Sequence, residues 1–162
     1  MTDQPKALLA QFAQNCTLAA PTIRRRQQSK DGTVKYLLQL ADGNCIETVL
    51  MRYHHGNTVC ISSQVGCRMG CAFCASTLGG KVRDLTPAEM LDQVLFTGLD
   101  SGVPISNIVL MGIGSRWTIL TRYCGFWNWS PPEGSTSACV TCSLSTCGLA
   151  DQIDNWPIIS YN

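Results

Sequence analysis

The chain has 162 residues, of which 45% are apolar and 14% are charged, and its 12 Lys and Arg residues against 11 Asp and Glu residues leave a net charge of +1. This composition suits one modest globular domain and excludes both two large domains and a charged disordered tail. It also excludes a general electrostatic attraction to nucleic acid, so any RNA contact has to be local.

The N-terminus predicts neither secretion nor membrane insertion. Residues 1–15 lack a basic start followed by an apolar core, and no stretch approaches the ~18 to 20 apolar residues that a membrane helix needs. We therefore expect a cytoplasmic protein with no membrane partner. In that reducing compartment the ten cysteines favour metal or catalytic chemistry over a disulfide framework.

The first distinctive features along the chain are a basic run and a set of β-rich segments. Arg24–Arg26 is read as a solvated charged surface, with contact to RNA phosphates as the functional alternative. Val34–Leu40 and Cys45–Tyr53 flank Ala41–Asn44, whose Asp-Gly pair predicts a β-hairpin. Thr58–Ser62 predicts a third short strand.

A helix is predicted over about Pro87–Leu99. Thr86 and Glu89 have the spacing of a capping box, and proline occupies the first helical position. One helix face follows the 3.6-residue period and is expected to be buried. Its residues are Met90, Leu91, Val94 and Leu95. The end of the helix is marked by Gly98, Gly102 and Pro104.

The apolar run Asn107–Met111 is bounded by glycine and predicts a buried parallel strand. With the preceding strand and helix it makes a βαβ unit, so the predicted fold class is α/β. Such a unit needs further strands and helices to cover its sheet. Residues 115–140 have no sustained helical or strand period that would supply them.

The chemistry of the chain is expected at Cys67, Cys71 and Cys74, which form a C-x3-C-x2-C array. Three thiolates on one tight loop can hold three irons of a cubane 4Fe-4S cluster and leave the fourth iron open to a non-protein ligand. The alternative is a structural zinc site, which would need a fourth protein ligand. That ligand would be Cys60, His54 or His55.

Three segments together resemble a known family: Val59–Cys67, the cysteine array itself and Ile108–Gly114. They are similar to the RlmN-type adenine-C2 methyltransferases of ribosomal and transfer RNA, which are radical S-adenosyl-L-methionine (radical SAM) enzymes. The strand Ile46–Leu50 is similar too, and the resemblance covers about residues 4–114. It implies the N-terminal part of a radical-SAM partial (β/α) barrel, preceded by a β-hairpin and incomplete.

The resemblance also implies roles for matching residues. A 4Fe-4S cluster that binds S-adenosyl-L-methionine at its open iron has its ligands at Cys67, Cys71 and Cys74. Glu47 matches the family's proton acceptor, and Cys60 matches the cysteine that helps resolve the enzyme–RNA adduct. Gly114 and Ser145 match positions that contact the cofactor. From composition alone, Glu47 is an exposed strand carboxylate, Cys60 a buried core residue and Ser145 a turn serine.

The activity implied is methyl transfer from S-adenosyl-L-methionine to C2 of adenine in large-subunit ribosomal RNA and in tRNA. Implied partners are these RNAs and a reductant protein such as flavodoxin. Three alternatives stay open: a relative that methylates adenine C8, a non-catalytic iron-sulfur or zinc-binding remnant, and an intact RNA-binding module. The last lacks spaced aromatic residues and a continuous basic stripe.

The resemblance breaks after Gly114. The family continues Gly-Glu-Pro, whereas Ser115 and Arg116 follow here, and all four tryptophans lie beyond this point. With suitable third bases, deleting one nucleotide converts codons for Gly-Glu-Pro-Leu into codons for Gly-Ser-Arg-Trp, and family-like sequence returns at Ser143–Leu149. We infer a frameshifted, truncated fragment and expect it to be inactive.

The expected organisation of the chain has five parts. These are a remnant of an N-terminal RNA-contacting region with a linker (1–33), the start of the radical-SAM core (34–114), an out-of-register segment (115–141), a return to family-like sequence (142–154) and an unrelated tail (155–162).

Overall fold

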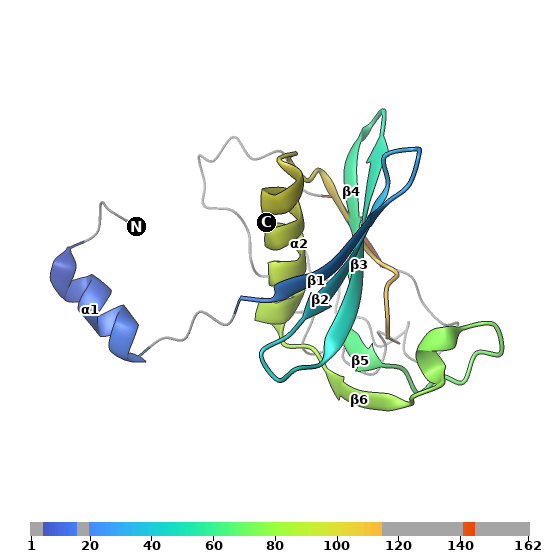
Figure 1. Cartoon of the computed structure of the whole chain (residues 1–162), viewed down its shortest axis with the longest axis horizontal. Helices are drawn as coiled ribbons and strands as arrows, with labels where there is room; N and C mark the ends of the chain where they lie inside the picture. The colour runs from blue at the N-terminus through green and yellow to red at the C-terminus, as the bar shows by residue number, and fades with distance from the viewer. Residues whose placement is uncertain (1–4, 16–19, 115–140, 145–162) are drawn as a thin grey trace, which may run out of the picture.

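The computed structural model describes residues 5–15, 20–114 and 141–144. Their centre is a six-stranded sheet with the strand order β1-β2-β3-β4-β7-β8. Strands β1 to β4 are antiparallel neighbours, whereas β4, β7 and β8 run parallel. The helix α2 packs on one face of this sheet (Figure 1). The architecture is therefore the mixed α/β fold that the sequence predicts.

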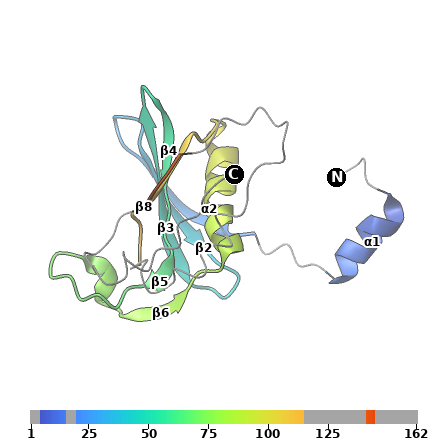
Figure 2. The same cartoon turned by 180° about the vertical axis from the view of Figure 1, so that it is seen from behind.

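Two elements precede the hairpin. The helix α1 (Lys6–Asn15) has no buried residue and stands apart from the sheet in both views (Figures 1 and 2). The strand β1 (Thr22–Gln28) pairs with β2 and carries Arg24–Arg26 at the edge of the sheet. Because β1 is almost entirely polar, its sequence has no alternation of apolar and polar residues that would predict a strand.

The predicted hairpin is confirmed. It consists of β2 (Val34–Gln39) and β3 (Cys45–Tyr53), and Gly43 in its turn has a φ of +86°, a value that favours glycine. Alternate side chains of the two strands are buried in the core beneath α2. These side chains are Val34, Tyr36, Leu38, Ile46, Thr48 and Leu50.

The predicted βαβ unit is confirmed as well. The strand β4 (Gly56–Cys60) leads by way of α2 (Pro87–Ser101) to β7 (Asn107–Leu110), which pairs parallel with β4. The strand β8 (Thr141–Leu144) pairs parallel with β7 and extends the sheet. The predicted irregular segment 115–140 lies outside the described residues.

The N-terminus of α2 has the predicted capping box. The Thr86 hydroxyl accepts a hydrogen bond from the Glu89 amide at 3.2 Å, and the Glu89 carboxylate accepts one from the Thr86 amide at 2.8 Å. These bonds satisfy backbone donors that a helix start leaves without an intrahelical partner. The helix runs through Gly98 and ends at Gly102, whose φ is +66°.

The expected buried face of α2 is partly wrong. Leu95 is 45% exposed, whereas Gln93 and Thr97 are buried. Leu95 lies two positions from Gln93, roughly 200° around the helix, so the two cannot face the same core. The buried stripe centres on Gln93 because its amide is hydrogen-bonded to the sheet and to the segment after β4.

A second, two-stranded sheet was not predicted. It consists of β5 (Gln64–Gly66) paired with β6 (Lys81–Asp84). The connection between these two strands contains the 3-10 helix η1 (Ala75–Thr77). This small sheet lies below the main sheet in the views of Figures 1 and 2, on the side toward which β4 runs. No helix in the described part of the chain is long and apolar enough to cross a membrane.

Candidate cluster-binding site

The cysteine loop, residues 67–74, lies between β5 and η1. Cys67 is buried, and Cys71 and Cys74 are half-buried. The Cys74 amide donates to the Cys71 carbonyl at 3.0 Å, and the Thr77 hydroxyl donates to the Cys74 carbonyl at 3.0 Å. Gly70 has a φ of +69° and open space around it. Local hydrogen bonds therefore shape the turn that carries Cys71 and Cys74, and Cys67 precedes this turn, directly after β5.

The donor set of this loop fits an iron-sulfur cluster in kind. Three cysteine thiols lie within eight residues, and no disulfide joins the six cysteines that the structure describes. Among these residues, however, no three His, Cys, Asp or Glu side chains converge on one metal position. The loop thus carries the sulfur atoms that a cluster requires, but in the described conformation these atoms do not point to one common position.

The two histidines of the zinc alternative lie elsewhere. Tyr53 and His55 flank the β3–β4 turn and stack with ring centroids 5.1 Å apart. This turn lies at the start of β4, whereas the chain reaches the cysteine loop from the other end of that strand. The structure therefore does not bring His54 or His55 to the cysteine loop.

Glu47 and Cys60 lie on the sheet face opposite α2. Alternation along β3 places Glu47 on the same face as Val49, and Val49 pairs with Cys60. The Glu47 carboxylate is about half-exposed and forms an ion pair with Lys35 at 2.6 Å. Cys60, at the end of β4, is half-buried. The two predicted catalytic residues therefore share one face, on neighbouring strands.

The predicted cofactor turn approaches the segment after β4 closely. A methyl group on Gly112 would lie 2.6 Å from the Ile61 carbonyl oxygen, and one on Gly114 would overlap Ser63 and Gln64. The Ser63 and Gln64 amides both donate to the Ile113 carbonyl, at 2.9 and 3.1 Å. Glycine is favoured at both positions, because the backbone of Ile61 and Ser62 lies against Gly112 and the side chains of Ser63 and Gln64 lie against Gly114. Ser145 lies outside the described residues.

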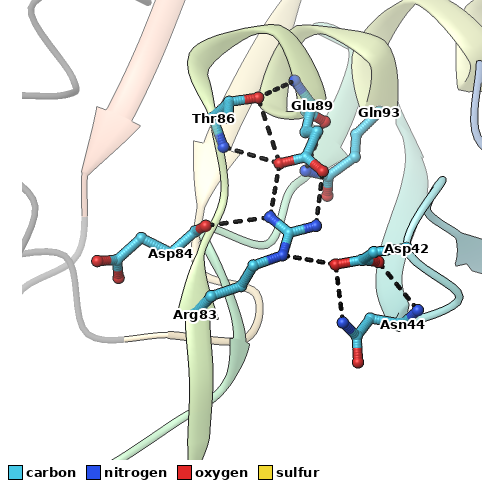
Figure 3. Close-up of polar contacts among 7 residues, drawn as sticks. All are labelled: Asp42, Asn44, Arg83, Asp84, Thr86, Glu89 and Gln93. Carbon is cyan, nitrogen blue, oxygen red and sulfur yellow. Dashed lines mark hydrogen bonds and ion pairs between the residues drawn. The ribbon is translucent and has the colours of Figure 1, made fainter. Parts of the chain in front are cut away.

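Arg83 forms an ionic network that the sequence analysis missed (Figure 3). Its guanidinium donates to both Glu89 carboxylate oxygens, at 2.7 and 2.9 Å, and to Asp42 at 2.7 Å. Hydrogen bonds from Arg83 and Asn44 lower the pKa of Asp42 to about 2. The pKa of Glu89 is lowered as well, chiefly by Arg83. The capping box identified Glu89, but no sequence signal placed Arg83 and Asp42 beside it.

This network joins three elements around the cysteine loop. Arg83 lies on β6, Asp42 in the β2–β3 turn and Glu89 in the first turn of α2. Asp84, also on β6, accepts a hydrogen bond from the Gln64 side chain of β5 at 2.7 Å and pairs with Lys81 at 2.7 Å. The strands that flank the loop are thus tied to each other and to the main sheet.

The basic run is partly engaged within the protein. Arg24 donates to Gln39 at 2.6 Å, and Arg26 pairs with Asp100 at 3.2 Å. Asp100 also accepts a 2.8 Å hydrogen bond from Tyr36. These contacts attach the edge strand β1 to β2 and to the end of α2, so two of the three arginines have a structural role.

The chain was compared with known proteins. No family model matches it. A relative from Lachnospira eligens is 67% identical over 133 residues, which cover 80% of this chain and 37% of the relative. One from Lachnoclostridium phytofermentans is 48% identical over 155 residues, covering 94% of this chain and 44% of the relative. Both are named probable dual-specificity RNA methyltransferase RlmN.

A solved structure shows the same fold. The crystal structure of a radical SAM methyltransferase from Sphaerobacter thermophilus has a TM-score of 0.83 and 37% sequence identity, and the match covers 95% of this chain and 47% of that one. The fold is therefore that of part of a radical SAM methyltransferase. More particularly, the chain is homologous to the RlmN proteins, which confirms the resemblance found in its sequence. It spans less than half the length of the relatives it matches.

Proposed function

We propose that this chain is the cluster-binding part of a radical SAM methyltransferase that acts on C2 of adenine in ribosomal RNA and tRNA. The observation that carries the proposal is the three-cysteine loop, which follows β5 in a chain 37% identical to a radical SAM methyltransferase. Cys67, Cys71 and Cys74 would hold the cluster as thiolates. A 4Fe-4S cluster bound there supplies the electron that activates S-adenosyl-L-methionine.

The protein groups near this loop have proposed roles of their own. Gly112 and Gly114 let their turn pack closely against residues 61–64, and Gly114 and Ser145 are the proposed cofactor contacts. Glu47, half-exposed beside Lys35, is the proposed acceptor for a proton from the substrate base. Cys60 is proposed to release the modified RNA by attacking, as a thiolate, the sulfur that links the enzyme to the RNA: an S–S bond forms, the S–C bond breaks, and the carbon left on the base keeps the electron pair and takes up a proton.

The proposal includes partners and a compartment. The RNA substrate is the partner that the relatives' name implies, and Arg25, on the edge strand, is the proposed phosphate contact of the basic run. A flavodoxin-type protein is the proposed electron donor. We place the reaction in the cytoplasm, which keeps thiols reduced.

Anaerobic reconstitution of the 162-residue chain with iron and sulfide tests the proposal. About four irons per chain and absorbance near 400 nm are expected for one cubane cluster. A colourless protein that binds one zinc ion per chain would instead support the zinc alternative. S-adenosyl-L-methionine binding to the reconstituted chain, measured by equilibrium dialysis, tests the cofactor assignment separately.

A further inference from the structure

Gln93 lies on α2, and its side chain faces the segment Ile61–Gln64 with no exposure to solvent. Its Oε1 accepts hydrogen bonds from the Thr48 hydroxyl at 2.9 Å and from the Ser62 amide at 2.8 Å. Its Nε2 donates to the Ser62 carbonyl at 2.9 Å and to the Glu89 carbonyl at 3.3 Å. All four hydrogen-bonding positions of the amide are used.

This pattern explains why the position needs glutamine. Ser62 presents both its backbone donor and its backbone acceptor to one side chain, and the Gln93 amide, with its separate oxygen acceptor and nitrogen donor, pairs with both. An apolar side chain of the same length would leave the Ser62 amide and carbonyl without these partners in the core, and a carboxylate would have no donor for the carbonyl. Gln93 therefore determines where Ser62 lies.

Ser62 extends the constraint to two further elements through its hydroxyl. The hydroxyl donates to the Glu47 carbonyl at 2.6 Å and accepts from the Ile113 amide at 3.0 Å. The Ile113 carbonyl in turn accepts from the next two amides of the segment, those of Ser63 and Gln64. Because Gln93 holds Ser62 in place, it also constrains the backbone of Glu47 and the turn before Gly114, both of which are hydrogen-bonded to the Ser62 hydroxyl.

The same segment leads directly to the metal ligands. Residues 61–63 connect Cys60 to β5, and Cys67 directly follows β5. A shift of Ser62 would therefore move the cysteine loop relative to the Gly112–Gly114 turn. Residues that orient metal ligands without touching the metal commonly contribute 10- to 100-fold to metal affinity.

We propose that Gln93 is a positioning residue of the cofactor site, which holds the cysteine loop and the Gly112–Gly114 turn in register through Ser62. This inference rests on the proposed function, because it assigns the register a role in binding the cluster. A purely structural Gln93 would stabilise the core without affecting cluster retention beyond its effect on folding.

The test compares Gln93→Met with the matched control Thr97→Val in the full 162-residue chain. Gln93→Met keeps the length of the side chain and removes all four hydrogen bonds. Thr97 lies one turn further along the same helix, is equally buried, and its hydroxyl has no hydrogen-bond partner in the described residues. Both variants perturb the α2 core, and only the first alters the contacts of Ser62.

Two measurements are made on each variant. Hydrogen exchange of the apo chain reports the Ser62 and Ile113 amides, and competition with a graded series of chelators reports iron retention after anaerobic reconstitution. For Gln93→Met we expect roughly 10-fold faster exchange at both amides and roughly 10- to 100-fold weaker iron retention. Thr97→Val should match the wild type in both.

Unchanged exchange or unchanged iron retention in Gln93→Met would overturn the inference. If that variant does not fold, Ser62→Ala decides the question, because it keeps the backbone bonds to Gln93 and removes only the hydroxyl link to Glu47 and Ile113. Wild-type iron retention in folded Ser62→Ala would likewise contradict it. A wild-type chain that binds no iron would refute the proposed function instead, and the exchange of apo Gln93→Met would still test the positioning of Ser62.

Discussion

The three cysteines of the loop differ in burial although they are only a few residues apart. Cys67 is 7% exposed and directly follows β5, whereas Cys71 and Cys74 lie in the half-exposed turn before η1. Cys60 is a fourth thiol in the same region of the chain, on β4 of the main sheet. The three proposed ligands therefore differ from Cys60 in lying together on one loop outside the main sheet.

Replacing any one of the three loop cysteines by alanine should abolish retention of a complete cluster. A site-differentiated cubane needs three thiolates, so two cannot hold it with the same geometry. Iron per chain after anaerobic reconstitution and desalting measures the effect. Cys60→Ala is the control and should keep its iron. A full cluster in Cys71→Ala would refute the ligand assignment.

The Arg83 network predicts a loss of stability in acid. The pKa of Asp42 falls from 3.8 to about 2, and that of Glu89 falls below its ordinary 4.5, so both carboxylates bind protons more weakly in the folded state than in the unfolded state. Their contribution is complete above the unfolded values and is lost as pH falls through the folded values. The midpoint of urea unfolding should therefore decrease between pH 4.5 and about 2.

Arg83→Met should flatten this dependence, because the guanidinium is the main cause of both shifts. At neutral pH we expect the unfolding free energy of the variant to be about 1 kcal/mol below that of the wild type. When the pH is lowered, the variant should lose less of its remaining stability than the wild type does. Arg52→Met is the control, since Arg52 is exposed and forms no ion pair within the described residues. An equal pH slope in wild type and Arg83→Met would contradict the assignment.

At the scale of elements, the β5–β6 sheet depends on one close backbone approach. Gly66 and Gly80 have almost the same φ, +69° and +68°, but a methyl group on Gly66 would overlap the Gly80 carbonyl oxygen, whereas one on Gly80 would meet open space. Substituting alanine at either position incurs the left-handed backbone penalty. Only the first also forces the two strands apart.

Gly66→Ala should therefore destabilise the chain more than Gly80→Ala does. The second change should cost about 1 to 2 kcal/mol from backbone strain alone, and the first should add the cost of separating β5 from β6. Urea unfolding gives the two values, and hydrogen exchange at β5 and β6 shows whether the excess is local. Equal costs would mean that the approach of the two strands is not tight in solution.

At the scale of the whole molecule, three strongly exposed apolar side chains lie in the cysteine loop and in the segment that follows it. Phe73 is 94% exposed, Leu78 88% and Val82 63%. Where such side chains form one continuous patch, the patch commonly marks a surface that another molecule covers. We expect the isolated chain to self-associate through this region, and to bind a dye that fluoresces on apolar surfaces.

The double variant Phe73→Ser with Leu78→Ser should lower both self-association and dye fluorescence, with a change in unfolding free energy within about 0.5 kcal/mol. Sedimentation and fluorescence titration measure the two effects. Leu99→Ser is the control, because Leu99 is 77% exposed on α2, outside the loop. Unchanged association in the double variant would show that this region is not the contact surface.

Local patterns predicted several parts of this protein without its tertiary structure. The Asp-Gly turn and alternating residues predicted the β2–β3 hairpin, and Thr86 and Glu89 predicted the start of α2. The cysteine spacing identified the loop at which we propose that the cluster binds. Each of these depends on residues within a few positions of one another. Turn conformation, capping and ligand spacing are short-range properties, so the sequence itself records them.

Other features depended on which distant segments meet. Sequence periodicity could not assign Gln93 to the core, because its burial requires Thr48 and Ser62 as hydrogen-bond partners from elsewhere in the chain. The placement of Arg83 between Asp42 and Glu89 has the same origin. A buried polar group is stable only when its partners are in place, and only the tertiary structure decides those partners. The sequence by itself determined the cysteine spacing, the hairpin and the start of α2, while the tertiary structure determined the β5–β6 sheet that flanks the cysteine loop and how that loop is held.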